Sequence, residues 1–505
     1  MAAIDDEDMR HNGLISAAAT VAMIVGGAAP VHSAELLIDN ATVVGVEPAR
    51  INGVRNVLVR DGRIVAVSEK ALTASAQAVR LNAKGKFLTP GLMDSHVHVS
   101  DPSGIPPLTD DLDIASLRAE FLKQQPRSYL YFGVTQLLDP SNSAEGIATF
   151  EGQPQHPDLF RCGAAPALDG YPAVFADKSV RYRIMPDWIY EPANARQHPL
   201  PAGESAADHT PEAVVSRIAA SGARCVKVFI EDGFGDSAEW PILNKATLEQ
   251  VTALAHRRGL LVMAHANALG MQKMAVAAGA DVIAHGLWNW DGLTAKTGLP
   301  PQIAEHLKIV RQRHIGFQPT LRVLYGMADM FRHDTLLDPM YAKVVPQNVL
   351  AWYRTDAGQW FKKQMRQGYG GAPDEKIMQS QFRIGELGMR VVKELFDSGS
   401  PLLLGSDTPS SPTYGNQPGY DTYREMRAMA QSGVSLAAIL QAATINNARQ
   451  FRLDRDYGSI ETGKVGNLLL LTANPLESVR AWSQIDKVIL RGQVIQRETL
   501  AAGGR

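Results

Sequence analysis

The chain has 505 residues, of which 45% are hydrophobic and 20% are charged, and its formal net charge is −2. This composition is typical of a globular protein with a sizeable core, and the nearly neutral charge gives no electrostatic reason to expect a nucleic acid as partner. The length exceeds one ordinary domain, although α/β barrels run long, so we expect two or three structural units. The two cysteines, Cys162 and Cys225, make neither a disulfide framework nor a CxxC metal site, and we expect both to be buried small side chains.

An apolar segment near the amino terminus is typical of a secretory leader. It follows Arg10, extends over residues 13–27, and is succeeded by small residues at Ser33 and Ala34. A disordered tail or a membrane anchor is the alternative, but a run so rich in Ala and Gly is only weakly apolar. We therefore predict a signal peptide over residues 1–34, no stable membrane span after its cleavage, and a periplasmic or secreted location.

Short strand-like runs occupy both ends of the remaining chain. Residues 35–86 alternate apolar runs with turn residues, and the same texture returns over residues 455–505. We expect these two stretches to form one small β-sandwich domain.

The middle of the chain, residues 87–454, alternates strand-like and helix-like segments. We expect helices over 211–222, 246–258, 269–278, 301–314 and 383–397. The expected strands are apolar on both faces, as strands of a parallel barrel must be, and they cover residues 88–98, 133–139, 161–168, 224–230, 260–265, 281–285, 316–321 and 401–407. The fold class we predict is α/β, a (β/α)8 TIM-type barrel accompanied by the small β-sandwich domain.

Residues able to do chemistry recur at or near the ends of these strands, where a barrel places its active site. They are His96, His98, Lys227, His265, His285 and Asp407. His96 and His98 lie one residue apart, so they project from the same face of an extended strand and are able to grip one metal ion.

Several imidazoles and one carboxylate suit a divalent metal such as zinc, although the same donors also serve manganese, iron and cobalt. A metal of this kind lowers the pKa of its bound water to about 7 and polarises a carbonyl group. Asp407 would then accept the water's proton and pass it to the leaving group.

Lys227 is the unusual member of the set. Cys225, Lys227 and Phe229 share one strand face, while Val226 and Val228 on the other face suit packing against helices. Lys227 should therefore point into the barrel, where a lysine titrates downward. It would make an ion pair, contact the substrate, or take up carbon dioxide to form a carbamate that bridges two metals.

The chain resembles the amidohydrolase superfamily, in the branch of imidazolonepropionases and metal-dependent Xaa-Pro or Xaa-Arg dipeptidases. The resemblance covers nearly all of the chain after the leader and is carried by five motifs, at residues 90–98, 264–266, 284–286, 405–408 and 458–467. It implies that His96 and His98 bind the more buried metal with Asp407, that His265 and His285 bind a second metal, and that Lys227 bridges the two as its carbamate. Dipeptidase-like members commonly have a Gly-rich turn where this chain has residues 231–235, and imidazolonepropionases use one metal without a carbamate. The sequence therefore leaves open whether the site holds one metal ion or two.

The chemistry predicted from this site is hydrolysis of an amide, a cyclic amide, or the C–N bond of an N-acyl amino acid or dipeptide. A carboxylic ester or lactone hydrolase is the alternative, because the same hydroxide attacks either carbonyl. Nucleobase deamination is disfavoured, since deaminases of the superfamily carry a glutamate where this chain has Ala268. A catalytically dead binding barrel is disfavoured because all six candidate ligands are present.

Residues after the sixth and seventh strands are candidates for binding a small-molecule substrate. Trp288 and Trp290 would wall an apolar or planar group or else pack between loops, and Arg322 and Tyr325 would hold a carboxylate and polarise a carbonyl. The insertion at residues 327–380 exceeds any usual loop, so we expect helices that form a lid or a contact in a homo-oligomer.

Overall fold

The computed structural model describes residues 35–106, 111–234, 239–410 and 412–504. The predicted signal peptide at residues 1–34 lies outside the described residues. In the described part of the chain, no helix is both long enough and apolar enough to cross a membrane.

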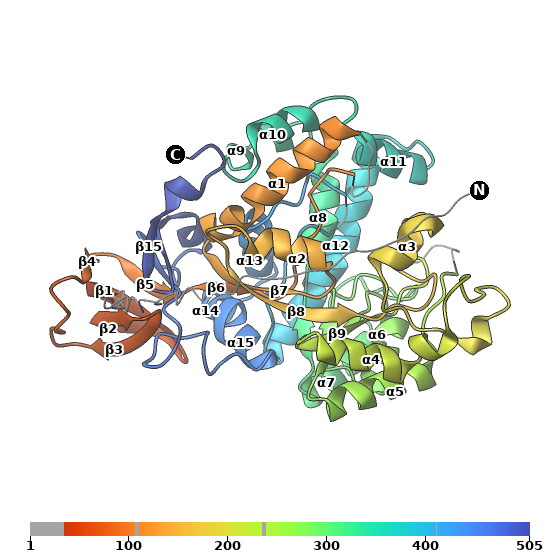
Figure 1. The fold of residues 1–505 in the computed structure, drawn as a ribbon, viewed down its shortest axis with the longest axis horizontal. Helices are drawn as coiled ribbons and strands as arrows, with labels where there is room; N and C mark the ends of the chain where they lie inside the picture. The colour runs from red at the N-terminus through yellow and green to blue at the C-terminus, as the bar shows by residue number, and fades with distance from the viewer. Residues whose placement is uncertain (1–34, 107–110, 235–238, 411, 505) are drawn as a thin grey trace, which may run out of the picture. The chain divides into compact units, whose positions relative to one another are not determined.

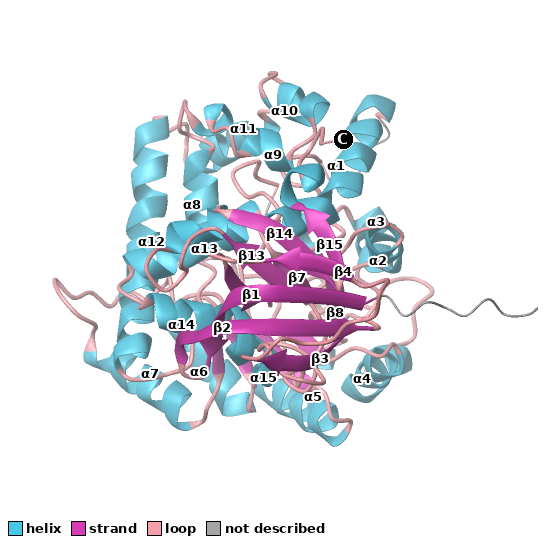
Figure 2. Cartoon of the chain, turned by 90° about the vertical axis from the view of Figure 1, so that its left-hand side faces the viewer, coloured by secondary structure: helices cyan, strands magenta, loops and turns pink. Residues whose placement is uncertain are grey.

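One sheet draws its strands from both ends of the chain. Figure 1 shows the first strands, in red and orange, beside the last strand, in blue, and Figure 2 shows this sheet face-on. Its pairing order is β15-β14-β13-β5-β1-β2-β3, with β4 paired in parallel to β1. A β-sandwich of two sheets was expected, but the hydrogen bonds join these strands into one sheet. The reason is that the long strand β1 pairs with β4 near its start and with β5 further along. The strands are β1 (Glu35–Val46), β2 (Ala49–Arg60), β3 (Arg63–Ser68), β4 (Val79–Asn82), β5 (Phe87–Pro90), β13 (Leu468–Leu471), β14 (Ile485–Leu490) and β15 (Gln493–Gln496).

A second sheet consists of seven parallel strands in chain order, which confirms the predicted mixed α/β architecture of repeated strand–helix units. Its strands are β6 (Leu92–Asp94), β7 (Val134–Asp139), β8 (Asp158–Ala164), β9 (Cys225–Phe229), β10 (Leu261–His265), β11 (Val282–Ala284) and β12 (Gly316–Gln318). The helices between them are α1 (Leu112–Tyr131), α2 (Ala144–Glu151), α3 (Lys178–Ile184), α4 (Pro211–Ala220), α5 (Lys245–Arg257), α6 (Leu269–Ala278) and α7 (Pro301–Gln312).

The segment expected as the eighth strand is not a regular strand, but it touches both outer edges of the parallel sheet. Leu402 forms an isolated parallel bridge with Phe317 of β12, and Thr408 forms one with Val97, just after β6. Asp407 also donates its backbone N–H to the carbonyl oxygen of His96 at 2.8 Å. The complete eight-stranded barrel stays a prediction, and these contacts are the ones that it requires.

Helices follow β12, as predicted for the insertion. They are α8 (Arg322–Asp329), α9 (Tyr341–Val344), α10 (Gln347–Tyr353), α11 (Trp360–Gly368) and α12 (Asp374–Asp397), the last of which begins nine residues before the predicted start at residue 383. The chain then continues through α13 (Tyr420–Gln431), α14 (Leu436–Gln441), a π-helical turn (Ala442–Asn446) and α15 (Asn447–Gln450) to the last three strands. Short 3-10 turns lie at Ala173–Phe175, Pro192–Asn194, Ala206–His209, Thr335–Leu337, Val479–Ser483 and Arg497–Leu500.

The single strand expected over residues 88–98 is divided at Gly91 into two strands that belong to different sheets. β5 pairs with β1 and β13, whereas β6 pairs with β7 of the parallel sheet. A β-carbon at Gly91 would lie 1.8 Å from the Thr135 hydroxyl oxygen, so only glycine allows the chain to cross at this point. His96 and His98 consequently follow β6 and are not part of its pairing.

The absence of a disulfide, expected from the cysteine count, is wrong. Cys162 on β8 and Cys225 on β9 are direct partners in the parallel pairing, with their Cα atoms 4.4 Å apart, and they form a disulfide. Both are buried, as expected. The 63 residues that separate them hide this proximity from the sequence, because it depends on the strand register.

Candidate metal-dependent active site

All six predicted site residues line one pocket at the carboxyl ends of the parallel strands. The pocket has a volume of about 210 Å³. It receives side chains from the segment after β6, from β9 and β10, from the residue after β11, and from residues 402–408. These are His96, His98, Lys227, His265, His285 and Asp407.

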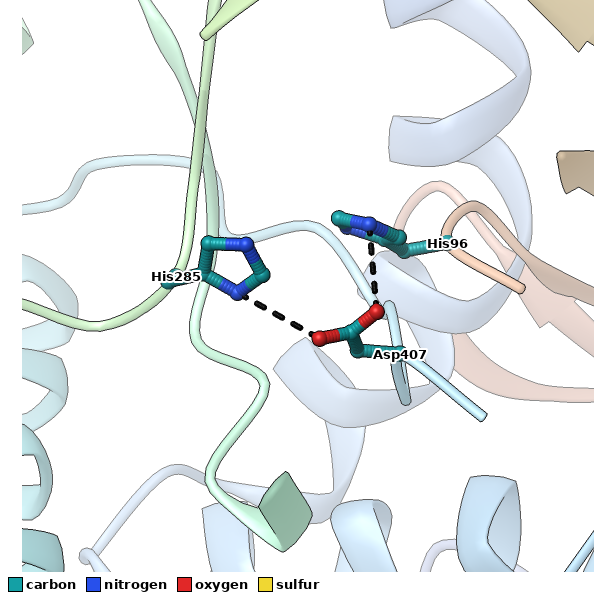
Figure 3. A group of neighbouring side chains, drawn as sticks. All are labelled: His96, His285 and Asp407. Carbon is teal, nitrogen blue, oxygen red and sulfur yellow. Dashed lines mark ion pairs between the residues drawn. The ribbon is translucent and has the colours of Figure 1, made fainter. Parts of the chain in front are cut away.

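His96, His285 and Asp407 form the tightest group in the pocket (Figure 3). One ligand atom from each lies within 4.8 Å of the others, and all three residues are buried. The Asp407 carboxylate is 3.3 Å from His96 Nε2 through one oxygen and 3.6 Å from His285 Nδ1 through the other. Two nitrogens and a carboxylate at this spacing are a donor set that zinc and related divalent metals accept.

The protonation states of this group suit a metal. Burial lowers the pKa of His96 and of His285 well below the ordinary histidine value, so both imidazoles are neutral. Burial alone would raise the pKa of Asp407, but its contacts with His96, His98 and His285 outweigh burial and hold that pKa below its usual range. Neutral imidazoles and an ionised carboxylate are the forms that bind metals.

His98 joins the group through Asp407. Its Nε2 lies 2.9 Å from an Asp407 carboxylate oxygen. Burial lowers the pKa of His98, but the hydrogen bond and the charge of Asp407 more than compensate and raise it to about 9. The pair is therefore an ion pair at neutral pH in the protein without metal.

Two polar side chains that the sequence did not single out orient the histidines. Gln318, the last residue of β12, accepts from His96 Nδ1 at 3.0 Å and donates to the Ser95 carbonyl oxygen at 2.7 Å. The Thr320 hydroxyl lies 3.0 Å from His285 Nδ1. A second partner of this kind fixes the ring orientation of a metal-binding histidine. Gln318 was detectable by the rule that found the other site residues, since it ends a strand.

The backbone at two of the six predicted site residues is strained. His285 has φ = 82° and Asp407 has φ = 55°, a left-handed conformation that side-chain-bearing residues rarely adopt. Such residues persist only where the surrounding structure enforces them, and they concentrate at functional sites.

Lys227 is buried and its side chain lines the pocket, in agreement with the prediction that it points inward. Its Nζ is 3.5 Å from His96 Nε2, and within the described ranges it forms no ion pair. The neighbouring Val226 and Val228 pack on the opposite side in a cluster with residues of α4 and α5. Burial lowers the pKa of the lysine to about 7, although the charge of Asp407 acts in the opposite direction. A substantial share of neutral amine is therefore present at neutral pH.

His265 packs beside the tight group, with its ring centroid 4.3 Å from that of His285, and it also contacts Glu231. Its Nε2 lies 3.3 Å from Glu231, which also accepts from Asn267 Nδ2 at 2.9 Å and from the backbone N–H of Gly233 at 3.0 Å. Glu231 occupies the turn where the sequence departs from the dipeptidase pattern. The structure thus gives that departure a role, which is to hold the fifth-strand histidine.

Trp288 and Trp290 lie behind the site and are not among the residues that line the pocket. Trp288 is buried with its ring 5.4 Å from the ring of His285. Trp290 donates to the Leu287 carbonyl oxygen at 3.0 Å and lies under the guanidinium of Arg390. Their positions match the alternative of packing between loops, and a role in substrate binding stays a prediction.

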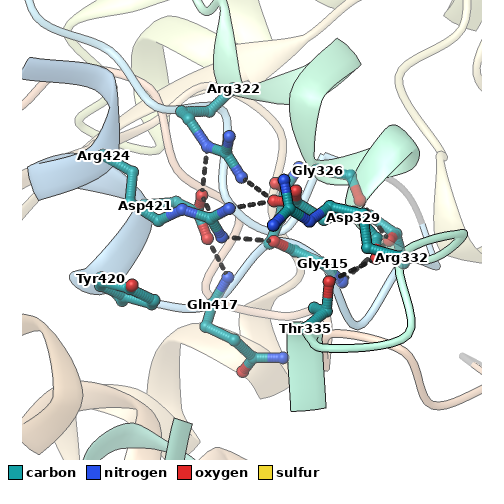
Figure 4. A network of polar contacts seen from close by, with 12 residues as sticks. Arg322, Gly326, Asp329, Arg332, Thr335, Gly415, Gln417, Tyr420, Asp421 and Arg424 are labelled. Carbon is teal, nitrogen blue, oxygen red and sulfur yellow. Dashed lines mark hydrogen bonds and ion pairs between the residues drawn. The ribbon is translucent and has the colours of Figure 1, made fainter. Parts of the chain in front are cut away.

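Arg322 and Tyr325 also lie outside the pocket lining. The Arg322 guanidinium is buried and donates to Asp421 at 2.7 Å and to Asp329 at 2.6 Å, in a network that Arg424 completes (Figure 4). The Tyr325 hydroxyl lies 2.8 Å from the sulfur of Met389. The donors of Arg322 are therefore used within the protein, and the predicted contact with a substrate carboxylate is not supported by this arrangement.

A family model described as "Amidohydrolase family" matches residues 87–495. A dihydroorotase from Anaeromyxobacter sp. (strain K) is 35% identical over 68 residues, which are 13% of this chain and 15% of that protein. An adenine deaminase from Mesorhizobium japonicum is 38% identical over 82 residues, which are 16% of this chain and 12% of that protein. The matches thus span only a small part of these curated relatives.

Solved structures share the fold over most of the chain. A Xaa-Pro dipeptidase with bound methionine has a TM-score of 0.64 at 17% identity and covers 92% of this chain and 100% of its own. A molinate hydrolase has a TM-score of 0.63 at 17% identity, with 93% and 96% covered. An ochratoxinase from A. niger has a TM-score of 0.62 at 16% identity, with 94% and 99% covered. At these identities the similarity establishes the fold.

Proposed function

Because this chain belongs to the amidohydrolase family, a family of hydrolases that act on carbon–nitrogen bonds, we propose that it uses a bound divalent metal to hydrolyse an amide-type C–N bond. The observation that carries the proposal is the convergence of His96, His285 and Asp407 within 4.8 Å in a buried pocket. Residues from three distant parts of the chain are brought together there in the protonation states that a metal requires.

The donor set fits the metal that the family uses. His96, His285 and Asp407 would hold one ion, with His98 beside Asp407, and we propose zinc as that ion. When bound, such a metal supplies a water of lowered pKa and polarises the substrate carbonyl. A second ion would need His265 to turn from Glu231 and Lys227 to be present as its carbamate, and both stay part of the proposal.

Asp407 and its neighbours would carry the proton in this reaction. Asp407 is ionised, and in this proposal it would accept a proton from the attacking water and deliver it to the nitrogen that leaves. His98 and His96 hold its carboxylate through one oxygen, which fixes its direction. Gln318 keeps His96 in the orientation that this contact requires.

The amide is favoured over the ester alternative because the similar solved structures include a dipeptidase, named for cleavage at a peptide bond. The match to an adenine deaminase revives deamination as a rival, but residue 268, where deaminases of the family carry a glutamate, is an alanine at the start of α6. The substrate itself is argued below.

The barrel and the location of the protein are part of the proposal. We propose that residues 402–408 close the parallel sheet as its eighth strand, which their contacts with Phe317 and His96 support. We also propose export to the periplasm or beyond the cell. The disulfide between Cys162 and Cys225 supports this location, because disulfides persist in oxidising compartments and are rare in the cytosol.

The proposal is tested by measuring bound metal and amide hydrolysis on the purified full chain. We expect His285→Ala to lower the metal content, whereas His306→Ala should leave it unchanged, because His306 is an equally buried histidine bonded to Gln272 outside the pocket. Asp407→Asn should lower turnover at least a hundredfold. A parent protein that binds no divalent metal, or a His285→Ala protein with the parent's metal content, would contradict the assignment.

A further inference from the structure

An aromatic wall borders one side of the pocket. It is centred on Tyr171, in the segment that follows β8, and its other rings come from the last residue of β9 and from the segment between β9 and α5. The centroid of the Tyr171 ring lies 5.8 Å from that of Phe229, 5.3 Å from that of Phe234 and 6.1 Å from that of Trp240, and it lies 4.6 Å from the ring of His265. We name these four side chains, Tyr171, Phe229, Phe234 and Trp240, the aromatic wall.

The wall faces the space in which a substrate would sit. Tyr171 and Phe229 line the pocket directly, together with further apolar residues. These are Pro102, Ile105, Pro172, Pro409 and Pro412. Phe234 extends the wall outward and is 47% exposed, which is unusual for so large an apolar side chain beside a catalytic pocket. A row of rings that leads from solvent toward His265 fits an apolar or planar group.

The charges of the pocket disfavour an anionic substrate. The lining residues that can carry a positive charge are Lys227 and the histidines, and all of them belong to the candidate metal site. The one further charged residue among the described lining is Asp101, which is a carboxylate. Arg322, which was expected to receive a substrate carboxylate, is held by two aspartates in its own network.

Residues 107–110, 235–238 and 411, which the structure does not describe, contain neither lysine nor arginine in the sequence. Beside the wall the described lining offers Lys227, whose Nζ lies 5.7 Å from the centroid of the Phe229 ring, and the proposed metal site would use this amine. A carboxylate on the wall-bound group would then be desolvated without a partner of its own, which is costly.

From these observations we infer that the substrate is an uncharged amide whose apolar group packs on the aromatic wall, and that the pocket selects against a free carboxylate on that group. This inference rests on the proposed amide hydrolysis and specifies its substrate class. It assigns Phe234 and Tyr171 as residues that determine specificity, and it places substrates such as N-acyl amino acids and dipeptides second to neutral amides.

The test compares two substrates that differ only in a carboxylate, N-acetyl-2-phenylethylamine and N-acetyl-L-phenylalanine, on the metal-loaded full chain. We expect kcat/KM to be at least tenfold higher for the neutral compound. Phe234→Ala should lower kcat/KM for the neutral compound at least fivefold, mainly through KM. Leu337→Ala, which removes an exposed apolar side chain outside the pocket lining, should not change it.

Equilibrium binding of both compounds to the Asp407→Asn protein, measured by calorimetry, separates the two levels of the argument. Tighter binding of the neutral compound without its hydrolysis by the parent would support the inference and refute amide hydrolysis. Equal or faster hydrolysis of the acid would overturn the inference and leave the proposed function standing. Binding of neither compound, or an unchanged KM in Phe234→Ala, would also overturn it.

Discussion

Replacing Arg322 by methionine should destabilise the protein more than any exposed charge substitution. Arg322 is 6% exposed, and its two bonds reach Asp421, which is fully buried, and Asp329, which is 7% exposed. Together with Arg424 these residues form a balanced set of two positive and two negative charges (Figure 4). Removing Arg322 leaves one buried negative charge uncompensated.

The loss expected is about 3–5 kcal/mol of unfolding free energy, the usual cost of breaking a buried ion pair from one side. Methionine keeps most of the side-chain volume, so the cavity contribution is small. Arg332→Met is the matched control, because Arg332 pairs with Asp334 at 2.9 Å with both side chains nearly half exposed, and an exposed pair contributes about 0–1 kcal/mol. Adding Asp421→Asn to Arg322→Met should recover part of the loss, since it removes the uncompensated charge.

Urea unfolding followed by tryptophan fluorescence measures these differences under one set of conditions. The reasoning would be refuted if Arg322→Met and Arg332→Met were destabilised equally, within about 0.5 kcal/mol. If Arg322 bound the substrate instead, its replacement would leave the unfolding midpoint unchanged and raise KM only for substrates that carry a carboxylate.

Three further outcomes follow from the site and the core. If Lys227 bridges two metals as its carbamate, elemental analysis should find about two metals per chain in the parent protein. The Lys227→Ala protein should contain fewer, whatever the bicarbonate concentration. About one metal in both proteins would make the site mononuclear. The denatured, unreduced protein should react with no thiol reagent and gain two free thiols on reduction, because Cys162 and Cys225 are joined; two thiols before reduction would contradict the pairing. Burial raises the pKa of Glu425 from 4.5 to about 8. Between these two pH values the native state therefore keeps a proton that the unfolded state has released. The contribution of Glu425 to the unfolding free energy should be fully present below pH 4.5 and be lost as the pH rises to about 8. Glu425→Gln should remove up to about 4 kcal/mol of the decrease in unfolding free energy between pH 5 and 8, and an unchanged pH dependence in urea unfolding would show that Glu425 is ionised throughout.

The sequence by itself determined the class of the fold and the candidate site. Strands and helices that alternate along a chain have a periodicity that local side-chain burial imposes, so most expected elements lie within a few residues of the observed ones. Parallel strands bring their carboxyl ends to one edge, and this rule was enough to place Lys227, His265, His285 and Asp407 in one pocket. His96 and His98 reached that pocket although they follow β6 and are not part of it.

Tertiary structure alone decided which polar groups meet one another. Arg322 and Asp421 are 99 residues apart and Cys162 and Cys225 are 63 apart, and nothing in local periodicity encodes the register that joins them. The sequence therefore suggested Arg322 as a substrate ligand and the two cysteines as buried small side chains that are not joined. Hydrophobic periodicity reports burial within one element, whereas hydrogen bonds and ion pairs depend on how distant elements pack. This packing assembled the aromatic wall and the balanced charges of the Arg322 network.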